Sequence, residues 1–300
     1  MKLATTDIFK NLFSDSSKKL IELNDEQLKL LQKTVLSIAD DIIGICEENS
    51  INYHLTGGTA LGAVRHNGFI PWDDDLDIDV ARKDYKKLIN LIKEEYGEKY
   101  YIHNPQNKDG FSLPATQIRL KNTIVRGCND ANEKECGAYI DIAIMENTFD
   151  NRILRKIHGN VSLALGFIVS CRKFAKNRKY LLSLVENNKE ATKIFKTKIA
   201  IGFVFSFFSL RRWTIIYDSW NKICKNENTE YVTVPTGRKY FWGELYKRKD
   251  FYEFTKHEFE GRNWKIPKEY DKYLTHMYGD YMKLPSIDRR EKHVLIKFEI

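Results

Sequence analysis

The sequence predicts an α+β fold in which helices flank a mixed β-sheet, followed by a helical section and a C-terminal segment that packs back on the core. Residues 1–150 alternate helix-like apolar spacing with short strand-like runs. From Asn151 to Asn228 the pattern is helical and basic and contains no proline, and from Tyr231 it is rich in aromatic and turn residues. We expect these regions (1–150, 151–230 and 231–300) to form one continuous fold.

The elements follow from the spacing of apolar residues. Leucine, valine and isoleucine recur three or four positions apart between Asp25 and Asn49, which predicts an amphipathic helix. A short strand over Tyr53–Leu55 follows it. A second amphipathic helix is expected over Asp84–Tyr96, strands over Ala115–Leu120 and Tyr139–Met145, and a short helix around Tyr270–Tyr278.

Composition narrows the class of protein. Of the 300 residues 42% are hydrophobic, and the net charge of +8 with a pI near 9.0 favours an anionic partner. The five cysteines are scattered and form no C-x-x-C pair, so we expect reduced thiols and neither a zinc site nor a disulfide framework. The N-terminal residues have no apolar run of the signal-peptide type, and we expect a cytoplasmic protein.

Two apolar runs, Val161–Cys171 and Ile199–Leu210, are shorter than the roughly 18–20 residues that span a bilayer. Lysine and arginine flank both of them. Each run is either a buried helix of a helical subdomain or part of a basic, apolar surface that contacts anionic lipid at the inner face of the membrane.

The acidic run after Trp72 carries the clearest chemical signal. In an extended chain Asp73, Asp75, Asp77 and Asp79 share one face, and the opposite face is mostly apolar. Two carboxylates about 4 Å apart repel by roughly 4 kcal/mol at an effective dielectric near 20, so a bridging cation is expected. Oxygen ligands alone suit Mg²⁺ or Mn²⁺. The alternative is a solvated acidic turn. A Ca²⁺ loop of the EF-hand type is excluded, because it needs a glycine and a distal glutamate at set offsets and both are absent.

A glycine pair precedes this acidic run. Gly57 and Gly58 lie between the strand and an expected helix, where a backbone without side chains can approach a phosphate and helix N–H groups point at it. Thr59 can add a hydroxyl donor. Arg65 and His66, further along the same helix, are candidates to contact an anion.

A third carboxylate is expected on a neighbouring strand. Asp141 lies in an otherwise almost wholly apolar run, where an unpartnered charge is costly to bury. Asp141 therefore either binds a metal ion or acts as a base. The alternative is that it forms a buried salt bridge. Arg119 and Lys121 are candidate phosphate contacts, although a solvated strand face explains each equally well.

Together these residues resemble the LicD family, which includes the fukutin-related proteins, within the nucleotidyltransferase-like superfamily. The stretch from Gly57 to Ile78 carries the resemblance, and the stretch from Phe259 to Pro285 is similar to the family's C-terminal signature, which Arg290 and His293 would close. The resemblance implies a nucleotidyltransferase-like core within one fold from about residue 25 to 295.

The resemblance also implies an activity. Such proteins transfer a phospho-alcohol, typically phosphocholine, from a CDP-alcohol such as CDP-choline to a sugar hydroxyl of a cell-surface glycan or its lipid-linked oligosaccharide precursor. It implies that Asp75, Asp77 and Asp141 bind the metal and that the glycine turn cradles the phosphate. Asp79, where the family often has a small residue, is interpreted as a surface charge. For choline, an aromatic cage is expected, with Trp72, Tyr139, Trp242 and Tyr278 as candidates.

Two other functions remain open at this stage. A nucleotidyltransferase that places a nucleotide on a small molecule, protein or RNA would use the same carboxylates, although the C-terminal stretch argues against it. A non-catalytic binding module would not need all three carboxylates. We expect no nucleic-acid partner, and choline, ethanolamine, glycerol and ribitol all remain open as the alcohol.

Overall fold

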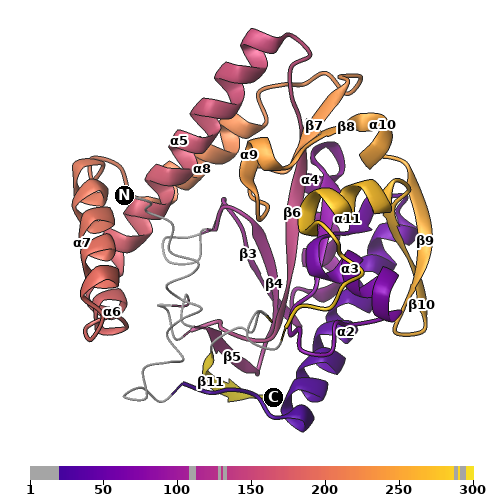
Figure 1. Ribbon diagram of the computed structural model, residues 1–300, viewed down its shortest axis with the longest axis horizontal. Helices are drawn as coiled ribbons and strands as arrows, with labels where there is room; N and C mark the ends of the chain where they lie inside the picture. Colours follow the sequence, from indigo (N-terminus) through magenta and orange to yellow (C-terminus); the bar gives the residue numbers. More distant parts are fainter. Residues whose placement is uncertain (1–19, 108–112, 128–129, 131–133, 287–289, 291–294) are drawn as a thin grey trace.

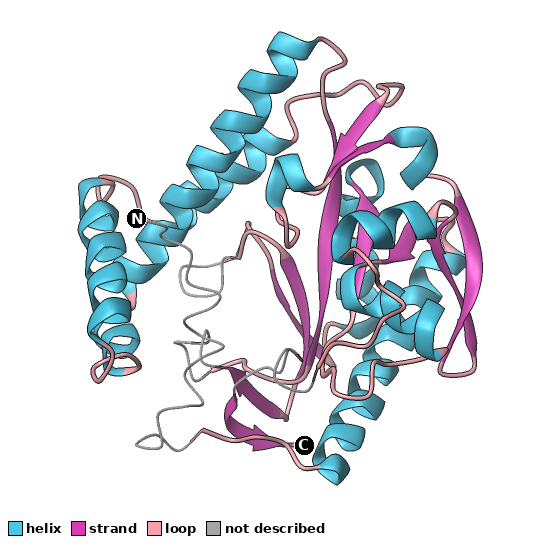
Figure 2. Ribbon diagram, viewed as in Figure 1, coloured by secondary structure: helices cyan, strands magenta, loops and turns pink. Residues whose placement is uncertain are grey.

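The structure is a computed structural model of the 300-residue chain. It describes residues 20–107, 113–127, 130, 134–286, 290 and 295–300 (Figure 1). Within these residues the fold is mixed α+β, as the sequence predicts, with helices on both sides of a curled sheet (Figure 2).

A mixed sheet forms the centre of the described chain. Its strand order is β1 (Tyr53–Leu55), β2 (Asp77–Ala81), β6 (Tyr139–Asn147), β4 (Thr116–Leu120) and β3 (Tyr100–His103). Strands β2 and β6 are parallel and the other pairs antiparallel. At the far end of β6 the sheet continues through β7 (Tyr231–Thr233) and β8 (Leu245–Lys247).

Two long helices cover the apolar side of this sheet. Helix α2 (Asp25–Glu48) starts at a capping box made by Asn24 and Gln27, and it buries a stripe of residues from Leu31 to Cys46. Helix α4 (Arg82–Tyr96) buries Leu88, Ile89 and Ile92. Both pack against β6, because their apolar residues recur at helical spacing and face the isoleucines of that strand.

The region after β6 is helical, with α5 (Arg152–Lys176), α6 (Arg178–Ser183), α7 (Lys189–Val204) and α8 (Leu210–Asn221). Its apolar residues form two small cores of their own, one around Phe195 and one around Trp213. In the described part of the chain no helix is both long enough and apolar enough to cross a membrane.

A buried ion network attaches the helical section to the sheet. The Arg82 guanidinium at the start of α4 donates to the Glu146 carboxylate of β6 and, at 2.7 Å, to Asp218 of α8. Glu146 and Asp218 are only 2% and 6% exposed. Since both carboxylates are buried, their pairing with Arg82 makes the position of α8 depend on the core.

The C-terminal segment packs back on the core, as predicted. After α9 (Tyr240–Gly243) and α10 (Arg248–Phe251), the hairpin of β9 (Phe254–Phe259) and β10 (Arg262–Pro267) lies beside β1 and α3 (Gly57–His66). Helix α11 (Tyr270–Tyr278) packs on α3. Strand β11 (Leu295–Glu299) pairs with β5 (Ile124–Gly127), so the end of the chain returns to the first half.

The predicted elements are confirmed, with shifted boundaries. Helix α4 begins two residues before the predicted Asp84, and the acidic strand begins only at Asp77, because Ile70–Asp73 form a hydrogen-bonded turn. Four cysteines, Cys46, Cys136, Cys171 and Cys224, are free and buried, while Cys128 lies outside the described residues. The three-part division of the chain stays a prediction.

Candidate functional site

Two predicted carboxylates face each other across parallel strands. Asp77, the first residue of β2, lies directly opposite Asp141 on β6. Because side chains alternate along a strand, both project to the same face of the sheet, away from Ile78 and Ile142 on the apolar face. The backbone N–H of Asp141 donates to the Leu76 carbonyl, which fixes the register of the pair.

The other acids of the run reach the same place from the turn that leads into β2. Burial first, and the charges of Asp75 and Asp141 next, hold the pKa of Asp77 well above its usual range. Asp73 also contributes to this shift. The side chains therefore crowd negative charge around Asp77. The alternating pattern predicted that Asp73 and Asp75 share a strand face with it, and this was wrong, because both precede the strand.

The glycine pair forms the first turn of α3 and abuts these acids. Gly57 has a φ of +55°, and a Cβ there would lie 3.3 Å from Asp77 Oδ2. A Cβ on Gly58 would lie 2.8 Å from Asp73 Oδ2. The positive end of the α3 dipole thus lies beside the carboxylates, and neither glycine has a side chain of its own to separate them.

Helix α11 holds this turn in place. The Tyr273 hydroxyl accepts a hydrogen bond from the Gly57 N–H at 2.8 Å and shares another with the Thr56 hydroxyl at 2.7 Å. Thr59 was predicted to donate a hydrogen bond to phosphate. It is 3% exposed, and its hydroxyl accepts a hydrogen bond from the Asp77 N–H at 2.8 Å. Thr59 therefore fixes β2 against α3.

A cleft of about 320 Å³ opens over the acids and the glycine turn. Gly58, Asp73, Asp75 and Asp77 line one part of it. Arg65 and two residues that sequence reasoning missed, Arg238 and Lys283, also line it. The cleft therefore presents carboxylates and cations to the same volume, an arrangement suited to a metal-bound phosphate ester.

Arg65 is held at the rim by two contacts. Its Nη1 donates to the Tyr281 carbonyl at 2.6 Å, and its Nε donates to His66 Nε2 at 3.0 Å. Burial and the Arg65 charge lower the pKa of His66. His66 is therefore neutral and accepts from Arg65, which indicates that it orients the arginine.

Arg119 lies away from the lining of the cleft. It is 3% exposed, stacks on the Tyr139 ring at 4.4 Å and pairs with Asp130 at 3.2 Å. Lys121 donates to the Gly97 carbonyl at 2.8 Å. A phosphate contact from either residue stays a prediction. The contacts within the protein are enough to account for both side chains as parts of the folded sheet.

Of the four aromatic candidates, Trp72 and Tyr278 line the cleft. The Arg290 guanidinium lies 4.1 Å from the Trp72 ring centroid, which brings part of the predicted C-terminal signature to the site. Trp242 instead donates to Asn160 of α5 at 3.1 Å. His293 lies outside the described residues.

Asp79 is not a surface charge, and that interpretation was wrong. It is fully buried on β2, opposite His54 of β1. Burial first, and the nearby Glu244 carboxylate next, raise the pKa of Asp79 well above its usual range. Two positions beyond Asp77 on a strand, Asp79 shares its face, but the C-terminal segment carrying Glu244 covers it. The sequence alone does not reveal that cover.

The acids fit a divalent cation by their chemistry. Asp75, Asp77 and Asp141 supply only oxygen. Burial first, and repulsion from the neighbouring acids next, raise the pKa of Asp77, and a bound cation would offset both. Among the residues that the structure describes, no group of three or more His, Cys, Asp or Glu side chains is arranged so that it could hold a metal ion. Mg²⁺ commonly takes one or two carboxylates plus substrate phosphates, so the donor substrate would complete such a site.

Comparison with known proteins identifies the same stretch. Residues 50–123 match the family model described as LicD/FKTN/FKRP, nucleotidyltransferase domain. The chain is 29% identical over 286 residues to the lipopolysaccharide cholinephosphotransferase LicD of Haemophilus influenzae, covering 92% of this chain and 97% of that protein. It is 42% identical over 56 residues to the human ribitol 5-phosphate transferase FKRP, covering 19% of this chain and 11% of that protein. The resemblance to the LicD family is thereby confirmed.

Proposed function

We propose that this chain transfers a phospho-alcohol from a CDP-alcohol to a sugar hydroxyl, because residues 50–123 match the LicD/FKTN/FKRP model and the chain is similar to a LicD cholinephosphotransferase over 92% of its length. The alcohol is choline, the acceptor is a cell-surface glycan or its lipid-linked precursor, and the reaction takes place in the cytoplasm. The full-length similarity to a cholinephosphotransferase supports this choice over ribitol, which rests on a match of 56 residues.

The observation that carries the proposal is the meeting of three features at one cleft. The glycine turn of α3, the carboxylates around Asp77 and the cations Arg65 and Arg238 all border it. A nucleoside diphosphate ester needs each of these: N–H groups and cations for its phosphates, and carboxylates for the Mg²⁺ or Mn²⁺ that accompanies them. Asp75 and Asp77 would hold this ion, which would supply charge neutralisation on the diphosphate.

The chemical step is an in-line displacement. The acceptor oxygen forms a bond to the phosphorus that carries choline, and the bond from that phosphorus to the bridging oxygen breaks. CMP leaves with the electron pair, and the proton of the acceptor hydroxyl passes to a base. Asp141, opposite Asp77, is the proposed base or the third metal ligand. Arg65 and Arg238 offset charge on the departing phosphate.

The aromatic residues of the cleft fit the choline end of the donor. Trp72 and Tyr278 both line it, and each ring already has a guanidinium beside it, Arg290 at 4.1 Å from the Trp72 centroid and Arg238 at 5.9 Å from the Tyr278 centroid. Rings that attract a cation in this way would also attract a quaternary ammonium. Ethanolamine would gain less from these rings, and ribitol would need hydrogen bonds instead. The aromatic lining therefore favours choline among the four alcohols.

The test is donor-dependent CMP release with Mg²⁺. Purified protein is mixed with CDP-choline, CDP-ethanolamine, CDP-glycerol or CDP-ribitol and a glycan acceptor extract, and CMP is measured by chromatography. Binding without acceptor is followed by thermal shift. CMP release and a stabilising shift with CDP-choline above the other donors support the proposal. Pyrophosphate release from CTP or ATP, with no CMP from any CDP-alcohol, would establish a nucleotidyltransferase instead.

A further inference from the structure

The net positive charge of this protein is concentrated in its helical section. Residues 151–217 contain 14 Lys and Arg but only two acids, Glu186 and Glu190, a formal charge of +12. Since the whole chain carries +8, the remaining residues sum to −4. The catalytic proposal does not use this charge, because the acid cleft is built from other elements.

Much of this charge lies along one face of α7. Lys189, Lys193 and Lys196 are exposed and lie three or four positions apart, so they form a single line on the helix. They border a shallow hollow together with Thr192 and Thr197. The opposite face of the helix, which includes Phe195, packs into the local core.

The same line continues into an exposed apolar tip where α7 ends and α8 begins. Phe203 and Val204 are 50% and 72% exposed, and Phe207 and Phe208 in the following turn are 66% and 40% exposed. The turn is anchored from beneath, because the Trp213 indole N–H donates to the Phe205 carbonyl at 2.9 Å. The tip is therefore an ordered part of the protein surface that presents four large apolar side chains.

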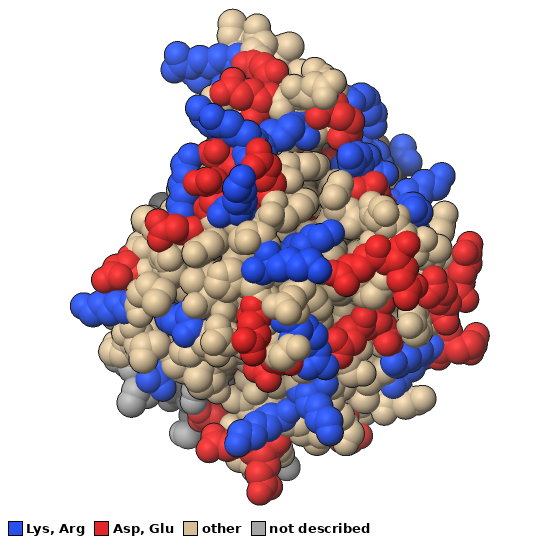
Figure 3. Space-filling view, turned by 90° about the vertical axis from the view of Figure 1, so that its right-hand side faces the viewer, with Lys and Arg blue, Asp and Glu red and all other residues tan. Residues whose placement is uncertain are grey.

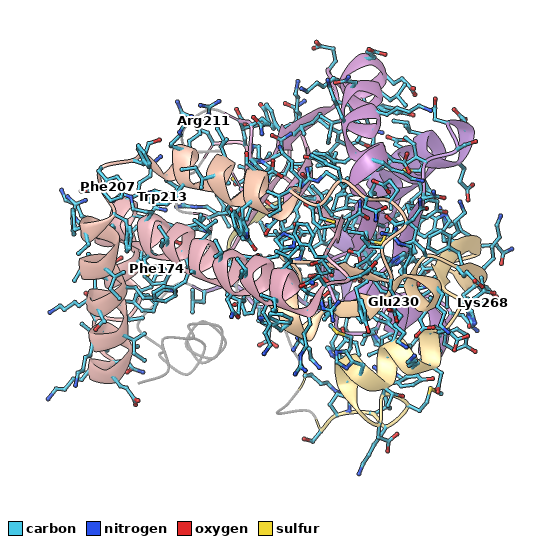
Figure 4. All side chains as sticks on the ribbon, turned by 90° about the horizontal axis from the view of Figure 1, so that it is seen from above. Phe174, Phe207, Arg211, Trp213, Glu230 and Lys268 are labelled. Atoms are coloured by element: carbon cyan, nitrogen blue, oxygen red, sulfur yellow. The ribbon has the colours of Figure 1, made fainter. Side chains whose placement is uncertain are left out.

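Arginines surround this tip. The guanidinium of Arg178 lies 5.5 Å from the Phe203 ring, and that of Arg212 lies 6.0 Å from the Phe208 ring. Figure 4 shows Phe207, Trp213 and Arg211 together at one end of the helical section, with Lys268 at the opposite side of the molecule. Apolar side chains ringed by cations are typical of a segment that lies in a membrane interface.

We propose that the α7–α8 tip and the lysine face of α7 dock this protein on an anionic lipid bilayer. The phenylalanines enter the boundary between headgroups and acyl chains, and the arginines and lysines contact lipid phosphates. From Lys189 to Phe203 the line extends about 21 Å at 1.5 Å per residue, so one helix can contact several headgroups.

Charge decides against a second copy of the chain as the occupant of this surface. A two-fold contact would bring the lysines of one α7 against those of the other, and like charges held together are unfavourable. The opposite side of the molecule, which carries β9 and β10, mixes acidic and basic side chains (Figure 3) and offers no comparable basic face. An anionic lipid surface matches both the charge and the apolar tip.

The experiment is flotation of the full chain with vesicles of phosphatidylcholine alone or with 30% phosphatidylglycerol, at 0.1 M and 0.5 M NaCl. The variants are Lys193→Glu/Lys196→Glu on the helix face and Phe203→Ser/Phe207→Ser at the tip. Lys249→Glu/Lys256→Glu, two exposed lysines outside the helical section, is the charge-matched control. Leu30→Ser on α2, 44% exposed, is the apolar control. Far-UV circular dichroism confirms the fold of each variant.

The wild type should bind the anionic vesicles and lose most binding at 0.5 M salt. The α7 lysine variant should bind at least about 25-fold more weakly, from about fivefold for each of the two lysines lost. The tip variant should lose about tenfold or more, and both controls should stay close to wild type. No binding to anionic vesicles, equal binding to neutral ones, or equal loss in the controls would overturn the proposal. So would a wild-type dimer that the tip variant makes monomeric.

Catalysis is measured separately in the same variants, as CMP release from CDP-choline without vesicles. The docking variants should retain this rate, and Asp77→Asn should retain vesicle binding. A failure of the lipid proposal can therefore be told from a failure of the proposed reaction.

Discussion

Replacing Gly58 with valine separates the proposed phosphate site from the stability of the fold. In the structure a Cβ at this position would lie 2.8 Å from Asp73 Oδ2, about 0.6 Å inside ordinary van der Waals contact. That oxygen is the end of a rotatable carboxylate, so Asp73 can turn aside at small cost. The glycine has an ordinary helical φ, and valine is a better helix former than glycine by a few tenths of a kcal/mol.

The expected change in the free energy of unfolding is therefore within about 1 kcal/mol, or about 3 °C in Tm for a chain of this size. Donor binding should respond far more strongly, because the added methyl groups occupy the space where the α3 turn would meet the diphosphate. A rise in Kd for CDP-choline of at least about tenfold corresponds to about 1.4 kcal/mol.

Gly62, one turn further along α3, provides the matched control. A Cβ there would lie 2.4 Å from the Gly68 carbonyl oxygen, which is backbone and cannot turn away. Gly62→Ala should therefore lower the free energy of unfolding by about 1–3 kcal/mol. Calorimetric titration with CDP-choline and Mg²⁺, together with urea unfolding, measures both quantities. If folded Gly58→Val binds the donor as the wild type does, the phosphate site lies elsewhere.

The carboxylates and their cationic partners lead to four further predictions. Asp75→Asn and Asp77→Asn should each lower CMP release at least about 100-fold and abolish stabilisation by Mg²⁺, and full activity in excess EDTA would refute the metal assignment. Arg82→Ala removes the cation between two buried carboxylates, leaving Asp218 paired with Lys222, and should cost about 3–5 kcal/mol in urea unfolding. Lys268→Ala breaks a solvated pair and should leave the urea unfolding midpoint close to that of the wild type. Burial raises the pKa of Glu244 to about 7, so the folded state holds a proton that the unfolded state releases near its ordinary value of about 4.5. Stability should therefore fall as pH rises between these values, by up to about 3 kcal/mol from this group, and Glu244→Gln should remove that slope in urea unfolding at pH 5 and pH 8.

The local pattern of the sequence determined the elements around the site. Helix α2, strand β1 and helix α11 lie where apolar spacing predicts them, because each has one buried face with its own period. The glycine pair before the acidic run likewise predicted a turn beside carboxylates. These features depend on neighbours a few positions apart, which a single sequence displays directly.

Contacts between distant segments required the tertiary structure. The sequence predicted Asp141 as a third carboxylate on a neighbouring strand, but only the parallel register of β6 with β2 shows that it lies opposite Asp77. Arg238 and Lys283 reach the cleft through the returning C-terminal segment. Lys283 lies in the stretch from Phe259 to Pro285, but nothing in that stretch distinguishes it from the other lysines, and no local pattern marks Arg238. Arg119 is the opposite case. The sequence made it a candidate to contact phosphate, but in the structure it pairs with Asp130 and stacks on the Tyr139 ring.

Asp79 shows the physical reason most clearly. Its place in the acidic alternation correctly gives the face of the strand, because side-chain direction is a local property of extended backbone. Whether that face is open depends on Glu244 and the C-terminal segment, more than 160 positions away in the chain. By itself the sequence nominated carboxylates for metal and a glycine turn for phosphate, and it located both in the chain. The fold decided which of them meet at the cleft, because burial is set by whatever segment packs on top.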